Sequence, residues 1–164
     1  MKNYDVNIIR EQFPALNRNV WDKPLIYLDS AASMQKPQKV LDAINRNYSF
    51  NYSNVHRGLH KLSEEATSNY EGARRKIANF INCNEKEVVF TSGATAAINL
   101  IAYSWGIKNL LPGDEIIITI AEHHANIVPW QIIASQKDVK IIAAKINPDE
   151  DFDPQIIKDL VTDK

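Results

Sequence analysis

The sequence predicts an α/β fold built on a parallel sheet. Three short apolar runs with strand character, Val88–Phe90, Glu115–Ile120 and Val139–Ala144, alternate with two segments of helical character. Strands that alternate with helices at this spacing lie parallel and are joined by right-handed crossovers. Ligands of open α/β sheets bind beyond the carboxyl ends of the strands, so a site is expected in the turns that follow the first two strands.

The composition is that of an ordinary globular chain of about one domain. The 164 residues are 45% hydrophobic and 24% charged, which excludes gross disorder. The 19 Lys and Arg residues nearly balance the 20 Asp and Glu residues, so no charge excess points to nucleic acid or to a membrane surface. Cys83, the single cysteine, excludes an intramolecular disulfide and a metal site built from several cysteines.

Neither a membrane span nor a secretory signal is expected. The longest strongly apolar run, Ile116–Ala121, is far shorter than the ~20 residues that cross a bilayer. The first residues form an amphipathic, acid-containing segment without the apolar core of a secretory signal. Together with the single cysteine, these features favour the reduced environment of the cytoplasm.

Two helices and a short strand are predicted before residue 51. Asp5 suits the N-cap of a helix that Pro14 ends, and Pro37 suits the first turn of a second helix. The run Leu25–Asp29 between them has strand character. The apolar positions that recur at helical spacing are Val6, Ile9 and Phe13 in the first helix, and Val40, Leu41, Ile44 and Tyr48 in the second.

A polar loop, residues 51–61, precedes the longest helical pattern. Ser63 is placed to cap this helix, with Glu64 and Glu65 favourably located in its first turn. The basic triplet Arg74–Lys76 near its end is interpreted as a solvated face. The predicted apolar stripe consists of Leu62, Ala66, Tyr70, Ala73, Ile77, Phe80 and Ile81.

Two further helices, Ala96–Lys108 and Ile127–Lys137, are predicted between the three strands of the parallel sheet, with a turn at Leu111–Asp114. Pro129 falls in the first turn of the second helix, where proline is tolerated. The last residues, Pro154–Lys164, have helical character but neither a cap nor a closing strand. The chain is therefore expected to be the front part of a longer protein.

The turn Thr91–Thr95 lies between a predicted strand and a predicted helix. Gly93 allows a tight turn, after which the amides of Ala94, Thr95 and Ala96 are expected to be free at the helix N-terminus. Free amides at the positive end of a helix dipole bind phosphate, and the Thr95 hydroxyl adds a further donor. A simple helix cap uses the same residue types, so both interpretations stay open. The glycine-rich patterns typical of dinucleotide and nucleoside triphosphate sites are absent.

Two adjacent histidines, His123 and His124, follow the predicted strand Glu115–Ile120. Adjacent side chains on extended backbone point to opposite sides, so one ring is expected to face the site while the other packs away. Such a pair does not chelate one metal ion as two histidines four residues apart on a helix do. The ring that faces the site could stack on an aromatic cofactor or move a proton. Two hydrogen-bonded structural histidines are the alternative.

His56 and His60 lie in the polar loop, four residues apart with Gly58 between them. An ordinary polar loop is favoured there over a zinc site, because the loop context does not place both rings on one helix face. Cys83 follows a predicted helix end without a specific base beside it, so a structural role is favoured over a reactive thiol.

Four segments, in this order, resemble the N-terminal part of a group II (Suf-type) cysteine desulfurase, an enzyme of the class V aminotransferase family that depends on pyridoxal phosphate (PLP). They are Tyr27–Ser33, Val55–His60, Val89–Thr95 with Ile98–Leu100 after it, and Glu122–Trp130. The last, Glu-His-His-Ala-Asn-Ile-Val-Pro-Trp, is the most specific. The resemblance runs from about Phe13 to the C-terminus and covers well under half of a typical family member.

The resemblance implies a fold-type I PLP-dependent transferase, with an N-terminal segment and the first part of a mostly parallel-sheet large domain. Residues 1–50 are then N-terminal helices and a short strand, and residues 51–164 begin the major domain. The family takes sulfur from L-cysteine for iron–sulfur cluster assembly, leaving L-alanine and an enzyme persulfide. PLP serves as the electron sink, while the protein orients groups and controls protonation. A homodimer and a sulfur-acceptor protein are the implied partners.

The resemblance also implies roles for individual residues. His123 matches the histidine that stacks on the PLP ring and assists proton transfers. Thr95, with the amide of Ala94, matches the phosphate-binding turn. His56 matches a histidine on the active-site side, and Ala31 and Ala32 match a segment beside the substrate. No metal is implied.

The sequence departs from the family pattern in two ways. Group II members often carry Arg-Gly-Thr-Thr-Glu where this chain has Ser92–Ala96, so one hydroxyl contact to phosphate is lost at Ala94 and the subunit contacts of this region change. The lysine that binds PLP, the aspartate at its pyridine nitrogen, the carboxylate-binding arginine and the nucleophilic cysteine are all expected after Lys164. The chain alone is therefore expected to be inactive.

Other functions fit the same residues. One is a fragment of a selenocysteine lyase or of another class V PLP enzyme, because the loop that carries the nucleophile lies outside this sequence. Another is a non-catalytic module that binds a full-length partner or a phosphorylated ligand, which Ala94 and Ala96 favour.

Overall fold

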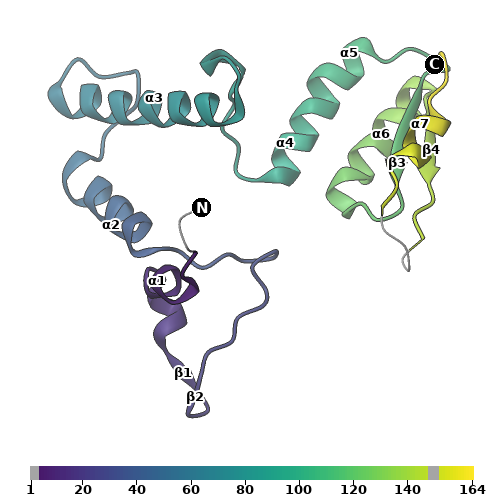
Figure 1. Cartoon of the computed structure of the whole chain (residues 1–164). Helices are drawn as coiled ribbons and strands as arrows, with labels where there is room; N and C mark the ends of the chain where they lie inside the picture. The colour runs from purple at the N-terminus through teal and green to yellow at the C-terminus, as the bar shows by residue number, and fades with distance from the viewer. Residues whose placement is uncertain (1–3, 148–151) are drawn as a thin grey trace. The chain divides into compact units, whose positions relative to one another are not determined.

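The computed structural model describes residues 4–147 and 152–164, and the chain forms two compact units, Met1–Val88 and Val89–Lys164 (Figure 1). The division at residue 50 that the sequence suggests falls inside the first unit and stays a prediction. Within the described ranges, no helix combines the length and the apolar character that crossing a bilayer requires.

The first unit is mainly helical. Its first helix begins as predicted, because Asp5 Oδ1 accepts hydrogen bonds from the amides of Asn7 (2.9 Å) and Ile8 (3.4 Å). The second begins directly after Pro37. The helical elements are α1 (Val6–Glu11), a 3-10 turn (Pro14–Asn17), α2 (Gln38–Arg46), a π-helical turn (Asn47–Asn51), α3 (Lys61–Ile81) and a 3-10 turn (Glu85–Glu87).

The predicted strand Leu25–Asp29 is wrong. The strands that form instead are a short antiparallel pair, β1 (Asn19–Val20) and β2 (Lys23–Pro24), joined by a turn at Trp21 and Asp22. Residues 25–29 follow β2 as irregular backbone. A strand requires a neighbour that completes its ladder of hydrogen bonds, and composition alone does not supply one.

The start of α3 also differs from the prediction. His60 is the N-cap, and its Nδ1 accepts a hydrogen bond from the amide of Ser63 at 3.4 Å. Ser63 lies inside the helix and is 1% exposed. Serine is a residue type that often caps helices, but the Ser63 hydroxyl instead forms hydrogen bonds with the loop before the helix.

The predicted apolar stripe of α3 is largely exposed within the first unit. Of its members only Ala66 is buried, whereas Phe80 is 90% and Ile81 57% exposed. The periodicity therefore predicted the helix correctly but not the burial of this face.

The second unit contains the predicted strand–helix–strand arrangement. Residues 115–119 and 140–144 pair in parallel, in a register that places Glu115 opposite Lys140 and Thr119 opposite Ala144. Figure 1 shows α6 and α7 beside this two-stranded sheet. The elements are α4 (Ala94–Ile101), a π-helical turn (Ala102–Gly106), α5 (Ile107–Asn109), β3 (Glu115–Thr119), a 3-10 turn (His124–Asn126), α6 (Val128–Lys137), β4 (Lys140–Ala144) and α7 (Gln155–Leu160).

The predicted strand Val88–Phe90 is wrong. These residues have no strand conformation assigned and lie where the two units join. The sheet described for the second unit accordingly has two strands, not three. An apolar run of this length indicates a strand only when a neighbouring strand is present to pair with it.

The core of the second unit joins α6 to the π-helical turn, to the end of α5 and to the strand pair. Ile133 is fully buried, and it clusters with Ala102, Leu110, Ala134 and Val139. The partly buried Ile116, Trp130 and Ile141 pack against this cluster. The turn that leads into β3 depends on Gly113, whose φ of 90° lies in the left-handed region that disfavours other residues.

Ile133→Ala tests this core. Removing the buried side chain should lower the free energy of unfolding of the chain by about 2–5 kcal/mol, because apolar contacts are lost and a cavity remains. Denaturant unfolding followed by circular dichroism measures the change. Ile132→Ala is the matched control, since Ile132 is the neighbouring residue of α6 and is 38% exposed. Equal losses in the two variants would contradict this assignment of the core.

Candidate functional site

A cavity of about 310 Å³ in the second unit brings together the two predicted site segments. One wall comes from the first turns of α4 and another from the turn that follows β3. The third wall is apolar and comes from α6. The lining residues are Thr95, Asn99, His123, His124, Ala125, Val128, Pro129 and Ile132.

The N-terminus of α4 presents free amides, as predicted. The first backbone bond of this helix joins the Ala97 amide to the carbonyl of Gly93 at 3.0 Å. Among the residues that the structure describes, the amides of Ala94, Thr95 and Ala96 have no hydrogen-bond acceptor, as is usual for the first turn of a helix. These donors and the Thr95 hydroxyl offer a positively polarised end to an anion.

Gly93 does not have the predicted role. Its φ of 161° and ψ of 177° are extended backbone that any residue adopts. A Cβ at this position would meet nothing within 4 Å. The helix also begins at Ala94, earlier than the predicted Ala96, so the turn is made without a conformation specific to glycine.

His123 is held by a hydrogen bond to its own turn. Its Nδ1 accepts from the amide of Ala125 at 3.1 Å, so in the neutral ring the proton is carried on Nε2. The ring nitrogen that remains for a ligand is therefore Nε2, which can donate a hydrogen bond or give up a proton.

The prediction that the two histidines separate is wrong. Both residues line the cavity, and their rings are neighbours, with centroids 6.2 Å apart and an interplanar angle of 83°. The reason is local backbone geometry, because a 3-10 turn begins at His124 and replaces the extended conformation that the alternation rule requires.

A chain of hydrogen bonds holds the histidine turn in place. The Thr119 hydroxyl donates to Glu122 Oε1 (3.1 Å), and the Asn126 side chain donates to Glu122 Oε2 (2.8 Å). The Trp130 indole donates in turn to Asn126 Oδ1 at 3.0 Å. Glu122, Asn126 and Trp130 lie four residues apart along the chain, and the bonds join the end of β3 to α6. The sequence interpretation missed this network, although the four-residue spacing was a signal for it.

The remaining predicted residues belong to the first unit. His56 Nε2 lies 3.1 Å from Glu71 Oε1, and its backbone φ is 63°. Ala31 and Ala32 lie in an exposed turn. Cys83 is half-buried just after α3, where its amide donates to the Ala78 carbonyl at 2.9 Å.

The histidines of the first unit do not share a metal site. The ring of His60 is used as the cap of α3. In the described parts of the chain there is no group of three or more His, Cys, Asp or Glu residues that could hold a metal ion.

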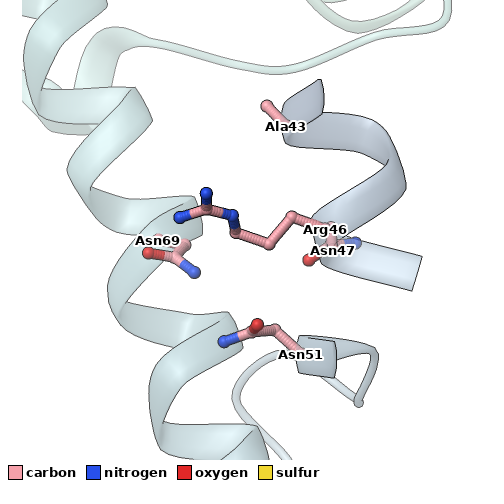
Figure 2. Close-up of a pocket in the computed structure, with 5 residues that line it drawn as sticks. All are labelled: Ala43, Arg46, Asn47, Asn51 and Asn69. Atoms are coloured by element: carbon pink, nitrogen blue, oxygen red, sulfur yellow. The ribbon is translucent and has the colours of Figure 1, made fainter. Parts of the chain in front are cut away.

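The first unit has a polar concavity of its own, of about 460 Å³, shown in Figure 2. The Arg46 side chain extends toward α3, which carries Asn69 (Figure 2). Asn51 is already engaged, because its Nδ2 donates to Glu65 Oε2 at 3.0 Å. The residues that line this concavity are Ala43, Arg46, Asn47, Asn51 and Asn69, which include no aromatic ring.

Comparisons with known proteins agree on one family. The family model described as aminotransferase class-V matches residues 26–164. A probable cysteine desulfurase of Synechocystis is 46% identical over 157 residues, which are 95% of this chain and 37% of that protein. The cysteine desulfurase of Thermococcus onnurineus superposes with a TM-score of 0.84 at 31% identity, over 97% of this chain and 38% of that one. The Escherichia coli cysteine desulfurase CsdA gives 0.78 at 38% identity, over 98% and 39%.

Asn126→Ala tests the network at the histidine turn. The change leaves Glu122 Oε2 and the Trp130 indole N–H without their partner, while Glu122 Oε1 keeps its bond from Thr119, and it should lower the free energy of unfolding by about 1–3 kcal/mol. The indole N–H resonance of Trp130 should also shift in the NMR spectrum. Asn109→Ala is the matched control, because Asn109 makes only an exposed bond to the Trp105 carbonyl. An unmoved Trp130 resonance would contradict the network.

Proposed function

The chain belongs to the class-V aminotransferase family, and from that premise we propose that it is the N-terminal part of a PLP-dependent cysteine desulfurase. Eight relatives named as cysteine desulfurases or probable ones are 44–50% identical to it. The chain spans about 37% of the length of the first of them. The observation that carries the proposal is the single cavity that Thr95, at the start of α4, and His123 both line.

The residues of this cavity fit PLP. Its phosphate suits the free amides of Ala94–Ala96 and the Thr95 hydroxyl, because a helix N-terminus stabilises an anion. Its flat ring suits the imidazole of His123, which lines the same cavity as the apolar Val128 and Pro129. In place of the threonine often found in group II enzymes, Ala94 supplies its amide but no hydroxyl.

These contacts define the proposed roles of PLP, of Thr95 with its neighbouring amides, and of His123. PLP, when bound, supplies an electron sink for chemistry at the carbon next to the substrate amine. Thr95 and the amides beside it anchor and orient the phosphate. His123 stacks on the ring and, since its Nδ1 is engaged, holds or transfers a proton at Nε2. The 3-10 turn and its hydrogen bonds keep that nitrogen at a fixed position.

The remaining machinery of the reaction is assigned to residues outside this sequence. No nucleophilic role is proposed for Cys83, because it closes α3 in the first unit. The chain alone is therefore proposed to be inactive. Ala31, Ala32 and His56 are proposed to lie on the substrate side in the complete enzyme. That enzyme is proposed to be a cytoplasmic homodimer of the group II type, which passes sulfur from L-cysteine to an acceptor protein for iron–sulfur clusters.

A second candidate function is a non-catalytic module with the same fold. It is favoured by Ala94 and Ala96, which lack the hydroxyl and the carboxylate that group II enzymes often carry at these positions. A selenocysteine lyase is a third candidate, which differs in substrate rather than in the cavity.

A hybrid enzyme separates the first two candidates. The matching N-terminal segment of the Escherichia coli desulfurase is replaced by this chain, and alanine formation from L-cysteine and PLP is measured. Activity in the hybrid, with none in the 164-residue chain alone, is the expected result. A folded hybrid that binds PLP but forms no alanine would support the non-catalytic module. Selenocysteine, tested as a parallel substrate, distinguishes the lyase.

His123→Ala in the active hybrid should keep PLP bound and lower kcat by roughly 100-fold or more, as expected when a proton-transfer group is lost. Absorbance measures the bound PLP and alanine formation measures turnover. His124→Ala is the comparison, because His124 lines the same cavity without the hydrogen bond that fixes the His123 ring. Equal effects of the two substitutions on kcat would contradict the assignment of His123 as the proton-transfer residue.

Thr95→Val in the same hybrid should weaken PLP binding by roughly tenfold to a hundredfold, because one hydrogen bond to a charged phosphate is lost in an isosteric change. Equilibrium titration with PLP gives the affinity. Thr91→Val is the control, since the Thr91 hydroxyl donates to the Gly93 carbonyl rather than facing the cavity. An unchanged affinity in Thr95→Val would mean that this turn only caps α4.

A further inference from the structure

Three side chains on one face of α3 contact the loop that carries His56. Ser63, Thr67 and Glu71 lie four residues apart, so they form a row along the helix. The Ser63 hydroxyl donates to the Asn54 carbonyl at 2.7 Å. It also accepts from the Gly58 amide at 3.0 Å. This one buried hydroxyl therefore holds both sides of the loop.

The backbone of His56 is fixed by the second member of the row. The His56 amide donates to the Thr67 hydroxyl at 2.9 Å, and that hydroxyl donates to the Ser63 carbonyl at 2.7 Å. His56 has a φ of 63°, a left-handed conformation that is uncommon for a residue with a side chain. The surrounding bonds thus maintain a conformation that an isolated loop would seldom adopt.

Gly58 allows the loop to lie this close to the helix. A Cβ built on Gly58 would lie 2.7 Å from the Cβ of Ser63, closer than side-chain carbons approach one another. A residue with a side chain at position 58 would therefore push the loop away from Ser63 and the other residues of the row on α3.

Glu71, the third member of the row, contacts the imidazole of His56. Glu71 Oε1 lies 3.1 Å from His56 Nε2, and Glu71 Oε2 lies 3.0 Å from Arg74 Nε. Arg74 in turn lies over the Tyr70 ring, with its guanidinium carbon 5.1 Å from the ring centroid, and it donates to the Val88 carbonyl. The His56 ring lies nearly perpendicular to the ring of the same tyrosine, with centroids 6.0 Å apart. The Glu71 carboxylate is thus positioned by Arg74, which is itself fixed by two further contacts.

We propose that Glu71 is a positioning residue that sets the tautomer and the direction of His56. A carboxylate oxygen offers only lone pairs, so with Glu71 Oε1 3.1 Å from Nε2 the neutral His56 ring is expected to carry its proton on Nε2 rather than set a second lone pair against the carboxylate. In that tautomer Nδ1 carries the lone pair, and it is the atom that His56 offers to a substrate or a partner. This inference about the ring stands on the first unit alone. Its catalytic consequence, an acceptor at Nδ1 on the substrate side, rests on the proposed function.

The tautomer is read directly by NMR. The 164-residue chain is labelled with nitrogen-15, and the imidazole nitrogen shifts of His56 are recorded at a pH high enough for neutral rings. The expected spectrum has a protonated Nε2 and an unprotonated Nδ1. A His56 ring protonated on Nδ1 in the unsubstituted chain would overturn the proposal, and this measurement depends on no variant.

Two substitutions at position 71 separate positioning from a general structural role. Glu71→Ala should move the His56 nitrogen shifts toward the mixture of tautomers of a free imidazole. Glu71→Gln should keep the original shifts, because its amide oxygen replaces the carboxylate oxygen beside Nε2 and likewise offers lone pairs. Glu64→Ala is the matched control, an exposed acid of the same helix that lies 4.0 Å from Lys61. Shifts that are unchanged in Glu71→Ala, or that move as far in Glu71→Gln or in Glu64→Ala as in Glu71→Ala, would overturn the proposal.

The hybrid enzyme then tests the consequence for catalysis. Glu71→Ala should lower kcat by about tenfold while PLP absorbance is retained, and Glu71→Gln should restore most of the loss. Tautomer shifts as expected together with a hybrid that lacks activity would contradict the proposed function but leave the role of Glu71 intact. An active hybrid in which Glu71→Ala has unchanged kcat would overturn the catalytic consequence.

Discussion

The Glu122 carboxylate is the group on which the candidate site depends. Its two oxygens accept from the end of β3 and from the 3-10 turn, and the bonds continue through Asn126 to the indole of Trp130. Trp130 packs against the core that contains Ile133, so the position of His123 is connected to the best-buried part of the unit. A short polar turn is thereby given the rigidity that a fixed proton donor at Nε2 requires.

The two units use the same principle to present a histidine. In each, one imidazole nitrogen is engaged by a neighbouring group, and the other nitrogen is left available. His123 accepts at Nδ1 and retains Nε2, whereas His56 pairs through Nε2 with Glu71 and retains Nδ1. The result is one ring that offers a donor and one that offers an acceptor, a difference that residue identity alone does not contain.

Periodicity and turn chemistry predicted most of the second unit, including the parallel pair, the helix that begins near Pro129 and the free amides at Thr95. They failed where structure depends on a neighbour. Leu25–Asp29 and Val88–Phe90 have strand composition but no assigned strand conformation. The stripe on α3 has helical spacing, yet Phe80 is 90% exposed. The histidine pair and the cap of α3 were mistaken because side-chain hydrogen bonds, at Ala125 and Ser63, decide the local geometry.

The most direct test of the candidate site is an NMR titration of the nitrogen-15 labelled chain with PLP, compared with pyridoxal, which lacks the phosphate. A phosphate site at the start of α4 predicts that PLP shifts the amides of Ala94, Thr95 and Ala96 together with His123. Pyridoxal should leave those three amides nearly unchanged. Equal responses to the two compounds, or shifts confined to the concavity around Arg46, would contradict the site.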